Sequence, residues 1–317
     1  LLEIGINIKV IFAPEHGFRD LADAGDKIQD GKDIETGVRI ISLYGGHLKP
    51  TPDDLKGIDV VMFDIQDVGV RFYTYISTLH YVLEACAENN VECIILDRPD
   101  PNGFYFDGNI ADTVYRSFVG MDPVPIVHGM TVGEYAGMIN GEGWLKNGVK
   151  CRLTVIKCND YTHKTLYELP VKPSPNLPNQ NSIYLYPSTC FFEGTSISLG
   201  RGTSFPFQVY GSPKLPDTGF SFTPESVPGA KNPPLLGEKC YGVDLRNAIA
   251  DKIVPSPKVN LEWVINAYNS YPEKENFFTP YFDVLASCPA LISQIQKVMS
   301  PEAIRASWKY GLENFWT

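Results

Sequence analysis

Apolar and polar residues alternate in blocks along the first half of the chain. Four short runs are rich in apolar or β-branched residues and are separated by mixed segments; they cover residues 8–12, 38–43, 60–63 and 93–96. Continuous apolar runs of this length are typical of strands in a sheet that is covered on both faces. We therefore predict four core strands in this half of the chain.

A helix is expected between the last two of these runs. From Tyr75 to Cys86, apolar residues recur at three- and four-residue spacing, which places them on one face of a helix that ends near Asn89. A strand, a helix and a strand of these lengths form a βαβ unit, in which the two strands pair in parallel. The fold class is therefore predicted to be α/β.

The parallel sheet is expected to continue beyond this unit. Thr131 begins a Thr-Val-Gly-Glu capping box, which predicts a second helix, and residues 152–157 read as the next strand. From about Pro170, several prolines mark a long irregular crossing. We place the domain boundary there, so that residues 1–182 form a Rossmann-like catalytic domain and residues 183–317 form a smaller α/β (α+β) domain that completes the cleft.

The C-terminal half differs in composition, because glycine-rich and proline-rich loops are expected among its helices. We expect a strand at 241–245 and helices at 259–270, 281–299 and 301–315. At the other end of the chain, residues 1–8 read as the end of a helix that runs directly into a strand. We expect that an N-terminal strand, and any export signal before it, precede this segment.

Composition narrows the functional classes. The chain of 317 residues carries a formal net charge of −10, which argues against nucleic acid as a partner because phosphate binding needs clustered Lys and Arg. No stretch approaches the ~20 consecutive apolar residues of a membrane-spanning helix, so we expect no membrane span. Seven cysteines at irregular spacing indicate neither a metal site nor a disulfide framework. We expect no metal and no cofactor.

Charged side chains follow three of the predicted strands. In open α/β sheets, ligands bind beyond the carboxyl ends of the strands. These ends carry, in chain order, Glu15 and His16, then Asp64, Asp67 and Arg71, then Asp97 and Arg98. We predict that these residues converge on one active site. The alternative is that Asp64, Asp97 and Arg98 form only a buried ion-pair lattice.

Glu15 is the candidate with the most constrained surroundings. It stands between a proline and a His-Gly pair, in a short turn directly after a strand. A carboxylate that is held in place and partly desolvated suits acid/base catalysis near neutral pH. Two other interpretations stay open for this turn: Glu15 caps a helix or pairs with Arg19, and His16 is a structural hydrogen-bonding residue.

A second cluster lies at residues 193–203. The glycines beside Arg201 allow the backbone to approach a ligand closely, and Glu193 offers a second carboxylate. The segment lacks the Walker A pattern of a phosphate-binding loop, so nucleotide binding is not favoured. Aromatic residues at 71–75 provide either a stacking surface for a sugar ring or part of the core.

Six segments, taken in order, resemble the successive motifs of the exo-β-N-acetylmuramidase (NamZ) family. They are PEHGFR at 14–19, FDIQDVGVRFYTY at 63–75, LDRP at 96–99, HGMTVGE at 128–134, PSPN at 173–176 and EGTSISLGRGT at 193–203. The resemblance spans nearly the whole chain. Asp100 stands where the family's D-R-P-N-P stretch has Asn, and Phe18 and Val70 vary within their motifs.

The resemblance implies an exo-acting glycoside hydrolase with a Rossmann-like N-terminal domain. The family's reaction releases non-reducing terminal N-acetylmuramic acid from β-1,4-linked peptidoglycan fragments, and its members are mostly exported bacterial proteins of cell-wall turnover. An extracytoplasmic location and a peptidoglycan-derived glycan or muropeptide as partner follow from the resemblance. Two other classes remain open: another α/β enzyme that acts on a nucleotide or phosphosugar, and a non-catalytic glycan-binding protein.

A glycosidase usually needs one carboxylic acid to protonate the leaving oxygen and a second group on the opposite face of the sugar. We predict Glu15 as the acid/base and Glu193 as its partner, with Asp64 or Asp67 next; retention, inversion and assistance by the substrate's acetamido group stay open. Arginine suits the lactyl carboxylate of the substrate. The predicted substrate-binding set is His16, Asp67, Arg71, Tyr73, Asp97, Arg98, His128, Asn176 and Arg201.

Overall fold

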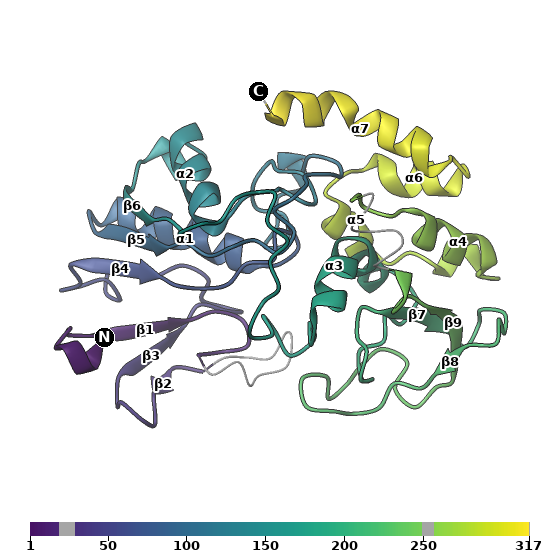
Figure 1. Cartoon of the computed structure of the whole chain (residues 1–317), viewed down its shortest axis with the longest axis horizontal. Helices are drawn as coiled ribbons and strands as arrows, with labels where there is room; N and C mark the ends of the chain where they lie inside the picture. The colour runs from purple at the N-terminus through teal and green to yellow at the C-terminus, as the bar shows by residue number, and fades with distance from the viewer. Residues whose placement is uncertain (19–28, 249–256, 317) are drawn as a thin grey trace. The chain divides into compact units, whose positions relative to one another are not determined.

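The computed structural model describes residues 1–18, 29–248 and 257–316 (Figure 1). They form two compact units, and each unit combines separate stretches of the chain. The first unit comprises Leu1–Gln66, Thr74–Arg98 and Val132–Asn159, and the second comprises Asp67–Tyr73, Pro99–Thr131 and Asp160–Thr317. The boundary expected between residues 182 and 183 stays a prediction.

A parallel three-stranded sheet organises the first unit (Figure 1). Its strands β4 (Val60–Phe63), β5 (Glu92–Leu96) and β6 (Arg152–Ile156) lie in that order. The helices α1 (Tyr75–Glu88) and α2 (Val132–Glu142) connect them, and both contact β5. The predicted βαβ unit and the α/β fold class are confirmed.

Burial along these strands alternates. Val61 and Phe63 are buried, whereas Val60 and Met62 are each 40% exposed. Consecutive right-handed crossovers place successive helices on the same face of a sheet, and α1 and α2 contact each other as well as β5. Among the residues that the structure describes, the prediction that the sheet is covered on both faces is therefore wrong for β4.

A second sheet of the first unit contains β1 (Val10–Ala13), β3 (Arg39–Ser42) and β2 (Gly31–Lys32) in the order β1-β3-β2. β1 and β3 are parallel, with Ala13 opposite Ser42, and the N–H of Leu43 donates to Ala13 O over 2.8 Å. The two loops that follow these strands therefore begin side by side. The short helix η1 (Leu2–Ile4) precedes β1, and η3 (Lys146–Gly148) precedes β6.

The second unit contains a small antiparallel sheet and most of the helices. Its strands lie in the order β7-β9-β8, and β9 corresponds to the strand expected at 241–245. The bounds of these elements are η2 (Thr113–Tyr115), α3 (Gln180–Thr189), η4 (Cys190–Gly194), β7 (Val209–Ser212), β8 (Ser221–Phe222), β9 (Cys240–Asp244), α4 (Glu262–Ser270), η6 (Lys274–Asn276), α5 (Tyr281–Ala286), α6 (Ala290–Gln296) and α7 (Pro301–Trp316).

The helix α3 lies where an irregular crossing was predicted, and it contains Pro187. Proline removes the hydrogen bond to the carbonyl four residues earlier, which here belongs to Ile183. The Nδ2 group of Asn102 donates to that carbonyl over 3.3 Å. A side chain from a distant segment therefore makes the helix tolerate a residue that the local sequence pattern reads as a breaker.

The helix expected at 281–299 is divided into α5 and α6. Ser287 ends α5 in the left-handed region, with φ of 43°, and Pro289 directly precedes α6. The predicted helix ends at this point because neither residue continues an α-helix without cost. In the described part of the chain, no helix is both long and apolar enough to cross a membrane.

Candidate active site

Glu15 lies in the turn that leaves β1. The N–H of Gly17 donates to Pro14 O over 3.0 Å, and His16 has φ of 69°, in the left-handed region. A residue other than glycine in this region is strained and is usually held there by its surroundings. His16 is buried and Glu15 is half-buried. The turn therefore fixes the backbone from which the Glu15 side chain extends.

Both carboxylate oxygens of Glu15 accept hydrogen bonds from hydroxyl groups. Tyr44 Oη donates to Oε1 over 2.9 Å, and Thr74 Oγ1 donates to Oε2 over 3.0 Å. The hydroxyl of Tyr75 donates to the backbone carbonyl of Glu15 over 3.3 Å. Arg19, which was the alternative partner of Glu15, lies outside the described residues. The first unit therefore surrounds this carboxylate with oriented hydroxyl donors.

Asp64 and Arg98 follow β4 and β5 and form an ion pair. Arg98 donates through Nε over 2.9 Å and through Nη2 over 2.6 Å, both to Asp64 Oδ1. The side chains are 46% and 41% exposed, so the pair stands in solvent and is not part of a buried lattice. The parallel register of β4 and β5 explains why the two side chains meet.

Asp97 has a different position from its neighbour Arg98. Its Oδ1 atom accepts the N–H of Gly133 over 2.8 Å, at the first turn of α2, and the N–H of Arg98 over 3.0 Å. A Cβ at Gly133 would lie 2.8 Å from Asp97 Cγ. A carboxylate at a helix N-terminus stabilises the helix, so these contacts give Asp97 a role in holding α2.

In the second unit, Asp67 and His128 form a buried pair. His128 Nε2 lies 3.3 Å from Asp67 Oδ2, which also accepts the N–H of Gly69 over 2.7 Å. The N–H of Met130 donates to His128 Nδ1 over 3.3 Å. Because Nδ1 is an acceptor, the neutral imidazole carries its proton on Nε2, which faces Asp67.

Arg71 is the largest of the fully buried side chains, with 1% exposure. Its Nη1 atom donates to the carbonyls of Asn109 and Val124 over 2.8 and 2.9 Å. Its Nη2 atom donates to those of Leu285 and Ala286 over 3.3 and 2.9 Å. The guanidinium therefore satisfies backbone carbonyls of three segments within the second unit.

Tyr73 and Asn176 also bind backbone. Tyr73 Oη donates to Pro173 O over 2.5 Å, and Asn176 Nδ2 donates to Gly229 O over 2.9 Å. Both side chains are buried. These bonds hold the loops on which the two residues lie.

Glu193 and Arg201 form the second ion pair of the candidate site. Arg201 donates to Glu193 Oε1 through Nε, over 3.0 Å, and through Nη2. Its guanidinium carbon lies 4.9 Å from the centroid of the Phe207 ring, a cation–π arrangement. Although burial opposes the charge, the carboxylate of Glu193 raises the pKa of Arg201. The positive charge is therefore permanent at this position.

The structure brings the predicted residues together in pairs within each unit. Glu15 lies among hydroxyl groups and Asp64 binds Arg98 in the first unit, while Asp67 binds His128 and Glu193 binds Arg201 in the second. Tyr44 was missed because it belongs to no charged motif. The position of Tyr44 could have indicated this contact, because it lies two residues after a strand that pairs in parallel with the strand before Glu15.

The comparisons with known proteins cover almost the whole chain. The family model described as "Exo-beta-N-acetylmuramidase NamZ, N-terminal" matches residues 1–181, and the corresponding C-terminal model matches residues 184–317. A peptidoglycan β-N-acetylmuramidase NamZ from Bacillus subtilis (strain 168) is 40% identical over 327 aligned residues, which cover 98% of this chain and 78% of that protein.

Two solved structures, both DUF1343 family proteins from Bacteroides fragilis NCTC 9343, have the same fold. One matches with a TM-score of 0.91 at 48% identity and covers 99% of this chain and 85% of its own. The other matches with a TM-score of 0.79 at 29% identity and covers 98% and 84%. With both family models matched in order across the two parts, the chain belongs to the exo-β-N-acetylmuramidase NamZ family of glycoside hydrolases.

Proposed function

We propose that the chain releases non-reducing terminal N-acetylmuramic acid from β-1,4-linked peptidoglycan fragments, with Glu15 as the essential acid/base. The observation that carries this role is the hydroxyl group on each oxygen of the Glu15 carboxylate, in a turn at the carboxyl end of a parallel strand. Such a carboxylate is held in one orientation, which acid/base catalysis requires.

Glu193 is proposed as the second carboxylate, with Asp64 or Asp67 next. Arg201 binds one oxygen of Glu193 with two of its nitrogens, so the carboxylate has a fixed direction. Asp67 is buried against His128, and Asp64 is exposed beside Arg98. Arg98 orients Asp64 in the same way, but the Asp64 side chain is 46% exposed and that of Glu193 is 22% exposed. Glu193 is placed first because it is more shielded from water than Asp64 and is not buried as Asp67 is.

Arg201 is proposed as the receptor for the lactyl carboxylate of muramic acid. Its Nη1 atom makes no hydrogen bond to any residue that the structure describes, while Nε and Nη2 bind Glu193. Arginine can bind two carboxylates at once because its donors point along separate edges of the guanidinium plane. Arg98 and His128 are proposed as further contacts, Tyr73 and Asn176 as supports of the loops, and Arg71 as a scaffold residue.

The setting of the reaction is a further part of the proposal. Because peptidoglycan lies outside the cytoplasmic membrane, we place the protein in the periplasm or in the secreted fraction, with a function in cell-wall turnover. Fractionation of the native host, with detection of the protein by an antibody, tests this placement. Recovery of all the protein with the cytoplasmic markers would contradict it.

Hydrolysis of a chromogenic β-N-acetylmuramide tests the reaction and the role of Glu15 together. The native chain is expected to release the chromophore, and Glu15→Gln is expected to lose turnover while it keeps its thermal stability. Glu313→Gln, whose side chain is 63% exposed on α7, is the matched control and should keep full activity. Full activity of Glu15→Gln would remove Glu15 from the mechanism. An inactive native chain that still binds the glycan would favour a binding protein.

A further inference from the structure

We propose that Tyr44 and Thr74 are positioning residues that hold the Glu15 carboxylate in its reactive orientation, and that Lys49 holds the Tyr44 segment in place by binding α1. The proposal rests on the proposed role of Glu15. None of these three residues belongs to a charged pair at the end of a strand. All the contacts that carry it lie within the first unit.

The strand register places Tyr44 beside Glu15. Ala13 pairs with Ser42 in the parallel β1–β3 ladder. Glu15 lies two residues after Ala13, and Tyr44 lies two residues after Ser42. Parallel strands with equal offsets carry their following loops in the same direction. The 2.9 Å hydrogen bond between Tyr44 Oη and Glu15 Oε1 is the result. Any shift of the loop after β3 would move the hydroxyl away from the carboxylate.

Thr74 departs from the usual behaviour of a residue at its position. It is the N-cap of α1, where a threonine oxygen normally accepts a backbone N–H of the first turn, but it makes no such bond. Its hydroxyl instead donates to Glu15 Oε2 over 3.0 Å. The carboxylate consequently lies at the N-terminus of a 14-residue helix, where the helix dipole favours negative charge. A stabilising local contact has been replaced by one that orients Glu15.

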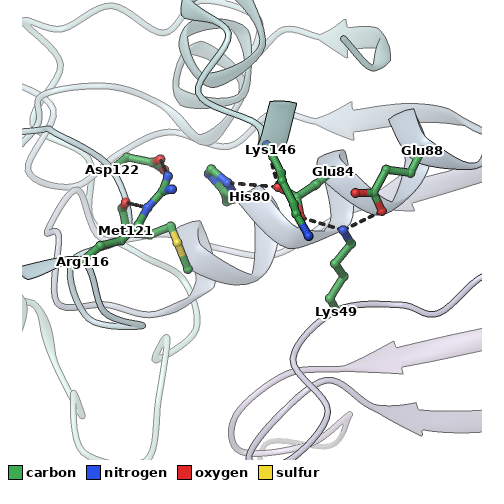
Figure 2. A network of polar contacts seen from close by, with 8 residues as sticks. All are labelled: Lys49, His80, Glu84, Glu88, Arg116, Met121, Asp122 and Lys146. Carbon is green, nitrogen blue, oxygen red and sulfur yellow. Dashed lines mark hydrogen bonds and ion pairs between the residues drawn. The ribbon is translucent and has the colours of Figure 1, made fainter. Parts of the chain in front are cut away.

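Lys49 ties the loop after β3 to the same helix (Figure 2). Its Nζ atom lies 2.6 Å from Glu84 Oε1 and 2.6 Å from Glu88 Oε2, one turn apart on α1. Glu84 is held from its other oxygen by the N–H of Lys146, over 2.8 Å. The Glu84 side chain is only 7% exposed, so its carboxylate is shielded from competing water, whereas Lys49 and Glu88 are 26% and 36% exposed. Both hydroxyl donors of Glu15 are therefore held by α1. Thr74 is the N-cap of this helix, and the loop that carries Tyr44 is attached to it through Lys49.

The expected consequence is an effect on the chemical step and not on substrate binding. A displacement of about 1 Å in a catalytic group can lower the rate by about 10²-fold. Tyr44→Phe and Thr74→Val each remove one hydroxyl while they keep most of the side-chain volume. Each is expected to lower kcat by about tenfold or more, with a change in KM below about twofold, because the lost contacts act on a reacting group.

Steady-state kinetics on the chromogenic β-N-acetylmuramide test these two residues. Thr74→Ser restores the hydroxyl and should return kcat to within about twofold of the native value, since a serine hydroxyl forms the same bond. Tyr310→Phe, at a tyrosine that is 77% exposed on α7, is the matched control. Native kcat in both Tyr44→Phe and Thr74→Val, with Glu15→Gln inactive, would overturn the positioning role alone. Activity in Glu15→Gln would overturn the proposed function instead.

A crystal structure of the Tyr44→Phe/Thr74→Val double variant gives a readout that does not depend on turnover. The Glu15 carboxylate is expected to leave its present orientation or to occupy more than one, because both oxygens lose a donor. An unchanged, single orientation of this carboxylate would overturn the proposal whatever the kinetics show.

A double-mutant cycle tests whether Lys49 acts through Tyr44. Lys49→Met is expected to lower kcat by about threefold to tenfold in the native background and to have little further effect in the Tyr44→Phe background, because coupled residues are not additive. Lys309→Met, at a lysine 75% exposed on α7, is the control for loss of charge. Equal reductions of kcat by Lys49→Met in the two backgrounds would show that the anchor does not act through this hydroxyl.

Discussion

Arg71 Nη2 donates a hydrogen bond to the backbone carbonyl of Ala286 over 2.9 Å, although 215 residues separate the two along the chain. The same guanidinium binds the carbonyls of Asn109 and Val124 through Nη1. One buried side chain thus joins three segments of the second unit. Loss of this buried guanidinium is expected to be strongly destabilising, because each of these carbonyls then remains without its donor.

We therefore expect Arg71→Lys to destabilise the fold and not only to change substrate affinity. A lysine ammonium is a single point with three donors and cannot bind all four carbonyls. The free energy of unfolding in urea should fall by about 3 kcal/mol. Arg152→Lys, at an exposed arginine with one backbone partner, should change it by less than about 0.5 kcal/mol. A stable Arg71→Lys variant with a raised KM would favour substrate binding by Arg71.

The elements that the sequence predicted well are those whose own residues decide their structure. The strands β4 and β5 and the helix α1 follow from local periodicity, and the charged residues after the two strands meet as Asp64 and Arg98 because the register is parallel. A rule that uses only neighbouring residues was sufficient for this part. It predicted the family's parallel-sheet fold and the charged residues at the ends of these two strands, but not that Asp64 and Arg98 form a solvent-exposed ion pair.

The elements that it missed depend on distant residues. The helix α3 accommodates Pro187 because Asn102 takes the released carbonyl of Ile183, and no local pattern contains that fact. Tyr44 became visible as a partner of Glu15 only when β3 was paired with β1. Glu193 and Arg201 were each predicted as residues of the site, but the sequence pattern did not predict that they bind each other.

Gly69→Ala should show why this glycine follows Asp67. Gly69 has φ of +74°, and a Cβ there would lie 2.7 Å from the Cγ atom of the buried Asp100. Gly219 has φ of +90° with open space around it, so Gly219→Ala measures backbone strain alone, about 1–2 kcal/mol. Gly69→Ala adds a steric clash in a packed site and should lower the melting temperature at least twice as much. Equal shifts in a thermal-unfolding assay would show that Asp100 moves freely.

Because of the ion pairs of Lys49 with α1, we expect the fold to lose stability in acid. Although burial opposes it, hydrogen bonds from Lys49 and from the N–H of Lys146 lower the pKa of Glu84 below its ordinary value of 4.5. A lowered carboxyl pKa contributes stability that is fully present above pH 4.5 and is lost as the pH falls through the folded-state pKa. Glu84→Gln should therefore be less stable than the native chain at pH 7, and the difference should shrink below pH 4.5.

Urea unfolding from pH 7 to pH 3 measures this difference, with Glu313→Gln as the exposed control on α7. The control should run parallel to the native chain at every pH, because an exposed pair contributes little. A difference between native and Glu84→Gln that stays constant throughout would mean that the charge of Glu84 is not what stabilises the anchor.

Arg305 and Asp107 attach α7 within the second unit. Arg305 donates through Nη1 to Oδ2 and through Nη2 to Oδ1 of Asp107, over 2.6 and 2.9 Å, and the N–H of Val259 donates to Oδ2 over 2.6 Å. The Asp107 side chain is 4% exposed, so Arg305→Met leaves a buried carboxylate without its cation and should cost about 3 kcal/mol of unfolding free energy. Asp107→Asn in the Arg305→Met background removes the charge but keeps an acceptor for Val259. The double variant should therefore be more stable than Arg305→Met alone in urea unfolding, and a double variant that is less stable would mean that packing of the arginine stem, and not its charge, attaches the helix.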